Sequence, residues 1–224
     1  MPKEDNTKSI AIVGDSFCRK AGVGTHFSEL LGPNIKNYSW AGASNHNICQ
    51  QAISALQDDT EVIFVSFTSS VRISFKLYDN PDTMNLDLHN RYYKPHDPNP
   101  KQDLLSSTYY QTQGGSNLST DKIKRFQAYH KEFTDLKNQT DLNYHLICSC
   151  LSRLSNSTKK IIWSQGGFDH PSFNGSVSWD FSQWQETRIN LNLWDHMDDA
   201  KSNQHITNPD THRLIAEQIM SAYV

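Results

Sequence analysis

The amino-acid sequence predicts an α/β protein in which helices cover both faces of a central parallel sheet. Short apolar runs typical of strands alternate along the chain with segments of helical periodicity, the order that builds a parallel sheet. The run at residues 61–67 (EVIFVSF) is apolar on both faces, as in strands buried between helices. A chain of 224 residues can bury a full core as one domain. We therefore expect a single domain over residues 1–224, a three-layer α/β/α sandwich with about five strands.

Five segments are expected to form the strands of this sheet. The first is residues 9–13 (SIAIV), an apolar run that ends at Gly14. Residues 35–40 form the second strand and residues 61–67 the third. A fourth is expected at residues 160–164 (KIIWS), and a fifth at 189–194, after a loop rich in Trp and Phe.

Two helices are expected between the first three strands. One covers residues 18–31 and is ended by Gly32 and Pro33. The other follows Ser44 or Asn45 as its cap, because apolar residues recur at helical spacing at Ile48, Ala52, Ala55 and Leu56.

The second half of the chain predicts two more helical regions. Residues 120–154 are expected to be helical, with a break near Asn138. The last helix has Asn208 as its cap and Pro209 in its first turn. One face of that helix is expected to be apolar, formed by Leu214, Ile215 and Ile219.

Composition excludes several classes of protein. The 21 Lys and Arg residues against 24 Asp and Glu residues give a net charge of −3, without the basic footprint on which nucleic-acid binding depends. No apolar run is long enough for a transmembrane helix, so no membrane partner is expected. The first residues lack the apolar core of a secretory signal. We therefore expect a cytoplasmic protein or, for a phage-encoded chain, one found in the host cytoplasm or the virion.

Cysteine, acid and glycine patterns predict neither a metal ion nor a cofactor. No CxxC pair occurs, and buried thiols are expected at Cys18, Cys49, Cys148 and Cys150. The acidic cluster at residues 195–199 lacks further ligands at a defined spacing, which favours solvated or capping residues. The glycines at positions 22 and 24 lack the third glycine of the dinucleotide fingerprint.

A long insertion is expected at about residues 76–117, where the periodicity vanishes. It contains several of the prolines together with Tyr92, Tyr93, Tyr109 and Tyr110. Loops of this length inside compact domains are usually functional or disordered. The tyrosines are expected either to face a sugar or a partner chain, or to pack the loop onto its own domain.

The sharpest local signal is the sequence Gly-Asp-Ser-Phe at residues 14–17, directly after the first strand. Reactive groups in open α/β sheets lie at the carboxyl ends of strands, which is where Ser16 is expected. The start of a following helix would offer free N–H groups to an oxyanion. The other interpretation is a strand-ending turn capped by Asp15 or Ser16. A small-residue turn around Gly42 follows the second strand, and His205 and His212 bracket the start of the last helix.

The order of these three motifs resembles that of the SGNH (GDSL-like) serine hydrolases. The resemblance covers the whole chain, with residues 76–117 as an addition, and it implies a flavodoxin-like fold. It implies an esterase that forms an acyl-enzyme on Ser16, with the backbone N–H groups of Ser16 and Gly42 as oxyanion donors. It also implies a histidine base just before the last helix.

Two family motifs are incomplete. The third block of the family carries an asparagine as oxyanion donor, and Ser70 stands in its place here. Arg72 could compensate as a cationic donor, or it could be an ordinary surface arginine. The last block is Asp-x-x-His in the family, but the residue three before His205 is Ser202, and the residue three before His212 is Pro209.

We favour His205 as the base and a structural role for His212, since the family's histidine precedes the last helix. The triad acid stays open among Asp195, Asp198 and Asp199, of which Asp199 is nearest to His205 in sequence. A dyad in which a backbone carbonyl orients the imidazole would also suffice.

Two functions from different classes fit these patterns. The first is a serine esterase that acts on a small hydrophilic ester, such as an O-acetylated glycan. The second is a catalytically impaired relative that serves as a binding or structural module, for example a viral or cell-surface accessory protein. Fold resemblance defines chemistry better than substrate, so the acyl group and the alcohol stay open.

Overall fold

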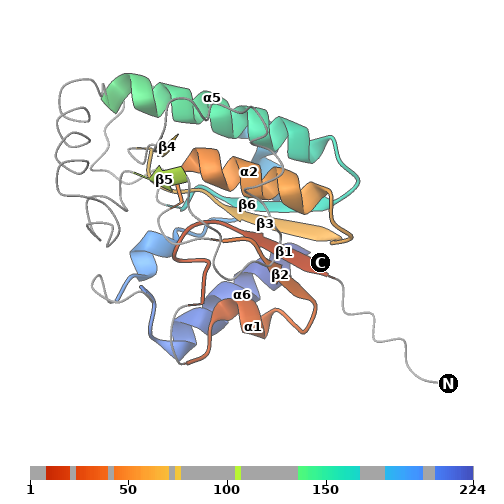
Figure 1. The fold of residues 1–224 in the computed structure, drawn as a ribbon. Coiled ribbons are helices and arrows are strands. Elements are labelled where there is room, and N and C mark those ends of the chain that lie inside the picture. Colours follow the sequence, from red (N-terminus) through yellow and green to blue (C-terminus); the bar gives the residue numbers. More distant parts are fainter. Residues whose placement is uncertain are drawn as a thin grey trace.

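A parallel sheet of four strands forms the centre of the fold, seen here in a computed structural model (Figure 1). The structure describes residues 9–20, 24–39, 43–70, 74–76, 104–106, 136–166, 180–198 and 205–223. The strand order is β2-β1-β3-β6, with all neighbours parallel. Flavodoxin-like doubly wound sheets begin with this order, so the predicted α/β class is confirmed. The strands are β1 (Ile10–Val13), β2 (Ile35–Asn37), β3 (Val62–Ser66) and β6 (Lys160–Ser164).

The direction in which successive strands are added across the sheet reverses at β1. This reversal distributes the helices over both faces. The chain moves from β1 to β2 on one side, then returns past β1 to β3 on the other. Because such crossovers are right-handed, opposite directions place their helices on opposite faces. Figure 1 shows α2 (Asn45–Leu56) and α5 (Leu136–Ser155) above the sheet, and α1 (Phe27–Leu30) and α6 (Pro209–Tyr223) below it. The gap between the ends of β1 and β3 is the topological switch point, where α/β sheets bind ligands.

Alternation along the strands divides the core into two clusters. In β1, Ile10 and Ile12 face the α1 and α6 layer, whereas Ala11 and Val13 face the α2 and α5 layer. The strand is buried at all four positions, as the apolar run predicts. The α2 side holds the fully buried Trp163, whose Nε1 donates to the Trp184 carbonyl oxygen at 3.0 Å. Both faces of the sheet are therefore sealed by apolar packing.

The helix caps follow the local sequence. Ser44 caps α2, and its hydroxyl accepts a hydrogen bond from the backbone N–H of Asn47. Helix α6 begins at Pro209, and Asn208 Oδ1 accepts from the Asp210 N–H at 2.9 Å. Both predicted helix starts are confirmed.

Three predictions about elements were wrong. Within the described part of residues 18–31, the helix is limited to the short α1, because Gly24 adopts a φ of 127° and the helix begins after His26. Residues 189–194 form no strand; the Ile189 N–H bonds the Trp163 carbonyl oxygen, and the chain then enters the 3₁₀ helix η5 (Leu193–His196). Helix α5 continues through Asn138 without a break, whereas residues 120–135 of the predicted helical region lie outside the described residues.

The prediction that Leu214 lies on the buried face of α6 was also wrong. Leu214 is 45% exposed, whereas the inward face carries His212, Ile215, Ala216 and Ile219.

Three of the four cysteines predicted to be buried thiols are buried, while Cys148 is half-buried, and all four cysteines are free.

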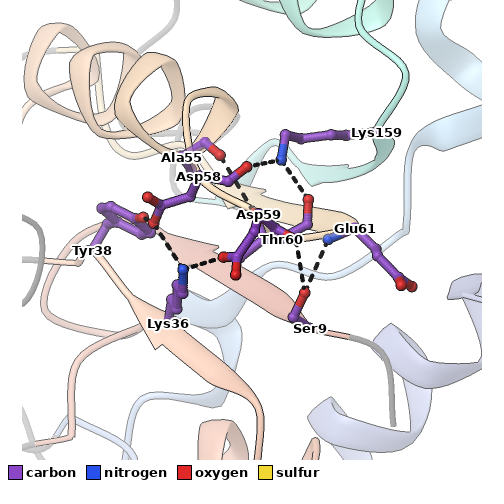
Figure 2. Close-up of polar contacts among 9 residues, drawn as sticks. All are labelled: Ser9, Lys36, Tyr38, Ala55, Asp58, Asp59, Thr60, Glu61 and Lys159. Atoms are coloured by element: carbon purple, nitrogen blue, oxygen red, sulfur yellow. Dashed lines mark hydrogen bonds and ion pairs between the residues drawn. The ribbon is translucent and has the colours of Figure 1, made fainter. Parts of the chain in front are cut away.

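A polar cluster joins the segments at the amino ends of the strands (Figure 2). Lys159, just before β6, donates to the carbonyl oxygens of Asp58 and Thr60, which precede β3. Lys36 on β2 forms ion pairs with Asp58 and Asp59. The cluster lies at the end of the sheet opposite to the carboxyl ends of the strands, so it stabilises the fold away from the candidate site.

The insertion at 76–117 lies largely outside the described residues. Its described part includes β5 (Leu104–Ser106), which pairs antiparallel with β4 (Ser74–Lys76) in a separate two-stranded sheet. The described helices include none that is long and apolar enough to cross a membrane.

Candidate active site

The turn after β1 is held in place by buried side chains from α2, from the turn itself and from the segment after β3. The Gly14 N–H donates to Gln51 Oε1 of α2 at 3.0 Å. Asp15 is 2% exposed; its Oδ1 accepts from the Phe17 N–H at 3.0 Å and its Oδ2 from Thr68 Oγ1 at 2.8 Å. Thr68 follows β3, so Asp15 ties the carboxyl ends of β1 and β3 together. The turn thus presents Ser16 at the switch point in a defined orientation.

Gly14 is required at the start of this turn by close packing. A Cβ atom at this position would lie 2.6 Å from Cys18 Sγ and 3.3 Å from the carbonyl oxygen of Ser66. Cys18 itself is fully buried, and burial together with the Asp15 carboxylate raises the pKa of its thiol well above the ordinary value. The thiol is therefore protonated and unsuited to act as a nucleophile, which leaves Ser16 as the nucleophilic group of the turn.

Ser16 and His205 are in hydrogen-bond contact although 189 residues separate them in sequence. The distance between His205 Nε2 and Ser16 Oγ is 3.0 Å. Phe17 packs against the imidazole, with ring centroids 4.7 Å apart, and Trp194 packs against Phe17 at 5.4 Å. This contact is the geometry that a serine nucleophile and its base require.

The second ring nitrogen of His205 is positioned for an orienting partner. Nδ1 is buried and has no hydrogen-bond partner among the described residues. A buried polar atom of this kind normally has a partner, and a triad acid would supply one. The described part of the chain therefore leaves a place for the acid beside His205.

Two of the three candidate acids lie within the described residues. The carboxylate of Asp198 accepts from the backbone N–H groups of Thr207 and Asn208, at 2.9 to 3.0 Å, and from the Thr207 hydroxyl at 2.9 Å. Burial acts to raise the pKa of Asp198, but these hydrogen bonds outweigh it and the pKa is lowered. Asp198 therefore anchors the approach to α6. Asp195 is exposed on η5, and Asp199 lies outside the described residues.

His212 occupies a different environment from His205. Its Nδ1 accepts from the Phe27 N–H at 3.2 Å, and its Nε2 bonds the Ile206 carbonyl oxygen at 2.9 Å. Both ring nitrogens thus bond to backbone, and the side chain is buried. This is the structural role expected for His212, and the contact with Ser16 belongs to His205.

The residues expected to bind the oxyanion are only partly within the described chain. Gly42 and Arg72 lie outside it. Ser70 is fully buried, and its hydroxyl lies 3.0 Å from Thr140 Oγ1 of α5. The Ser70 carbonyl oxygen accepts from Asn143 Nδ2 at 3.1 Å. These contacts anchor the segment after β3 to α5.

Sequence reasoning missed a pair of buried asparagines that hold this segment. Asn45 at the start of α2 bonds both backbone groups of Thr68, at 2.8 and 2.9 Å. Its Nδ2 also donates to Asn143 Oδ1 at 3.0 Å. Nothing in the local sequence distinguishes Asn143 from the other polar residues of its helix, so only the alternating burial of α5 could have pointed to it.

Within the described residues, no three side chains of His, Cys, Asp or Glu gather as a metal ion would require. The arrangement is instead that of a hydroxyl and an imidazole in contact at the switch point of an α/β sheet. Such a pair can transfer a proton from the hydroxyl and so activate it for attack on an electrophilic carbon.

Comparison with known proteins gives matches in structure but none in sequence. No protein-family model and no curated protein matches the chain. Among the solved structures that match is the psychrotrophic esterase EstA from Pseudoalteromonas sp., in a structure inhibited by monoethylphosphonate. The two chains share 9% sequence identity and a TM-score of 0.49, with 96% of each chain covered.

Proposed function

We propose that this protein is a serine ester hydrolase in which Ser16 is the nucleophile and His205 the base. The observation that carries the proposal is the 3.0 Å contact between Ser16 Oγ and His205 Nε2. It occurs where β1 and β3 end, the place at which open α/β sheets position reactive groups. The resemblance to SGNH hydrolases, which was drawn from the sequence motifs alone, assigns the same two residues to the same roles.

The reaction proceeds in two halves. His205 Nε2 takes the proton of Ser16 as Oγ attacks the ester carbonyl carbon, and the protonated imidazole then gives that proton to the departing alcohol. The bond between the carbonyl carbon and the alcohol oxygen breaks, which leaves an acyl group on Ser16. A water molecule, deprotonated by His205, attacks the acyl carbon, and the carboxylic acid leaves as Ser16 recovers its proton.

Oxyanion stabilisation falls to two backbone donors and one side-chain donor in this proposal. The N–H groups of Ser16 and Gly42 act on the developing negative charge, with Arg72 as a further donor. Ser70 contributes by anchoring its segment, because its hydroxyl is engaged by Thr140. Loss of one such donor typically lowers the rate by about 10²- to 10³-fold, so modest turnover is expected without the family's asparagine.

Asp199 is our proposed acid. Asp198 is engaged by Thr207 and Asn208, and Asp195 is exposed, so neither is suited to pair with the buried His205 Nδ1. The Asp198 N–H donates to the His205 carbonyl oxygen at 3.0 Å, which brings the two ends of the intervening segment together. The substrate proposed is a small hydrophilic ester, such as an acetylated glycan.

Labelling with a fluorophosphonate probe, followed by peptide mass spectrometry, tests this proposal. The probe phosphonylates a serine only where a base and oxyanion donors are assembled. We expect the adduct on Ser16, and its loss in Ser16→Ala and His205→Ala. Ser155→Ala and His145→Ala, which change exposed residues of α5, are the matched controls and should label normally.

Two results would contradict the proposal. One is a folded protein without an adduct on Ser16, which favours the second function, a binding module. The other is labelling that persists in His205→Ala. Asp199→Asn should lower the labelling rate, and an unchanged rate would leave a Ser16–His205 dyad.

A further inference from the structure

Two buried histidines lie outside the Ser16–His205 pair, and each contacts the backbone next to one residue of that pair. His26 precedes α1 and His212 lies in the first turn of α6; each is 1% exposed. His26 Nε2 bonds the carbonyl oxygen of Phe17 at 3.2 Å, and His212 Nε2 bonds that of Ile206 at 2.9 Å. Phe17 follows the nucleophile directly, and Ile206 follows the base. Each ring therefore holds the backbone next to one reactive residue.

The backbone fixes the tautomer of both rings. The Ser28 N–H donates to His26 Nδ1, and the Phe27 N–H donates to His212 Nδ1, each at 3.2 Å. A nitrogen that accepts from a backbone N–H carries no proton, so the ring proton lies on Nε2 in both residues. Each Nε2–H is then the donor to its carbonyl oxygen. Both rings are neutral and hydrogen-bonded at both nitrogens.

The two rings also contact each other. Their centroids are 5.0 Å apart, with an interplanar angle of 51°. A continuous path thus runs from the Phe17 carbonyl through His26 and His212 to the Ile206 carbonyl. The segments that carry Ser16 and His205 come from opposite ends of the chain. This path joins them through contacts that do not involve the Ser16 or His205 side chains.

We infer that His26 and His212 are positioning residues that together set the contact between Ser16 and His205. This inference rests on the proposed hydrolase function. Removing either Nε2–H donor frees one of the two segments, and small displacements of reacting groups reduce rates strongly. We name this pair the histidine bridge. It touches neither the substrate nor the reacting atoms, so it acts through position alone.

The charges around the bridge favour the neutral state near pH 7. Burial, and then the neighbouring His212, lower the pKa of His26 to about 4. The hydrogen bond to the Phe17 carbonyl oxygen and the Glu29 carboxylate oppose this lowering, while Lys20 acts in the same direction. Burial also lowers the pKa of His212, against the opposing effects of the hydrogen bond to the Ile206 carbonyl oxygen and of Asp198. Protonation of either ring would place an N–H against a backbone N–H.

Paired substitutions separate positioning from stability. His26→Leu and His212→Leu remove the donor, whereas His26→Gln and His212→Gln retain an amide N–H that can reach the same carbonyl oxygen. Ile219→Ala is the matched control, because Ile219 is fully buried on the same face of α6 and its side chain has no group that could donate to either carbonyl oxygen. All variants are compared at conditions where circular dichroism shows them folded.

The first readout is the second-order rate of fluorophosphonate labelling at Ser16. We expect the two Leu variants to label about 10- to 100-fold more slowly, with near-normal rates in the Gln variants and in Ile219→Ala. Folded Leu variants that label at the normal rate would overturn the inference. So would an Ile219→Ala variant that labels as slowly as His212→Leu, because the effect would then come from loss of packing.

The second readout does not depend on hydrolase activity. Long-range ¹H–¹⁵N NMR spectra report the tautomer and hydrogen bonding of the His205 ring in every variant. We expect its signals to shift in the Leu variants and to stay unchanged in Ile219→Ala. If the fluorophosphonate probe does not label the wild-type protein, the proposed function is refuted, and these spectra alone then test the histidine bridge. Unchanged His205 signals in both Leu variants would overturn the bridge itself.

Discussion

Acidification from pH 7 to pH 5 should destabilise the fold through His26. The pKa of this residue is lowered from its ordinary value of 6.5 to about 4 in the folded protein, chiefly by burial. In the unfolded chain the ring takes up a proton as the pH falls through 6.5, whereas in the folded protein it stays neutral until about pH 4. The stability that neutral His26 contributes is therefore fully present above pH 6.5, and it is lost progressively as the pH falls from 6.5 to 4.

The size of the loss follows from the two pKa values. One pKa unit corresponds to about 1.4 kcal/mol, and titration over this interval amounts to about 2 kcal/mol between pH 7 and pH 5. His212, whose pKa is also lowered by burial, adds a loss in the same direction. A change of this size is a large fraction of the stability of an ordinary domain.

Urea unfolding at pH 7 and at pH 5 measures the effect in the wild-type protein and in His26→Gln. The variant lacks the titrating ring, so its free energy of unfolding should fall by about 2 kcal/mol less than that of the wild type over the same interval. The difference between the decreases in free energy of unfolding of the two proteins excludes the contribution of the carboxylates, because these titrate in both proteins. Equal pH dependence in the two proteins would refute the reasoning, because His26 would then titrate alike in both states.

Two further predictions concern the two ends of the sheet. Lys159→Met removes the ammonium that donates to two backbone carbonyl oxygens at the amino ends of the strands, and should lower the free energy of unfolding in urea by about 1–3 kcal/mol. The labelling rate at Ser16 should stay normal, and a slower rate in folded protein would contradict the separation of this cluster from the candidate site. Gly166→Ala places a Cβ 2.0 Å from the Phe67 carbonyl oxygen at a residue with a φ of +54°, so the melting temperature should fall. An unchanged melting temperature would show that the carboxyl ends of β3 and β6 can separate to admit the methyl group.

Local sequence was sufficient where the deciding contacts lie within a few residues. The start of α6 follows from Asn208 and Pro209, because capping satisfies N–H groups of the same turn. Strands β1, β3 and β6 follow from their apolar runs, since a strand buried on both faces needs apolar side chains at consecutive positions. The same local reading placed Ser16 after the first strand.

Local sequence failed where an apolar pattern had more than one way to be buried. Leu191 and Leu193 were expected in a fifth strand, but they enter the core from an irregular segment and a 3₁₀ helix. Leu214 was expected to face inward, yet successive helical positions differ in direction by about 100°, and the packing of α6 turns it outward. In both cases the apolar character was recognised, and the neighbouring layer decided the geometry.

The sequence by itself determined the α/β class, the helix caps and the serine of the turn, because these depend on periodicity and on contacts between near neighbours. The family resemblance favoured His205 over His212 as the base, but only the tertiary structure shows which of the two contacts that serine. His205 and His212 lie seven residues apart around one helix start, and apart from that resemblance their local sequences do not distinguish them. His205 meets Ser16 across 189 residues of chain, while His212 turns inward to the backbone beside His26. Contacts over such separations arise when the sheet brings both ends of the chain to one edge, which is information that no local pattern contains.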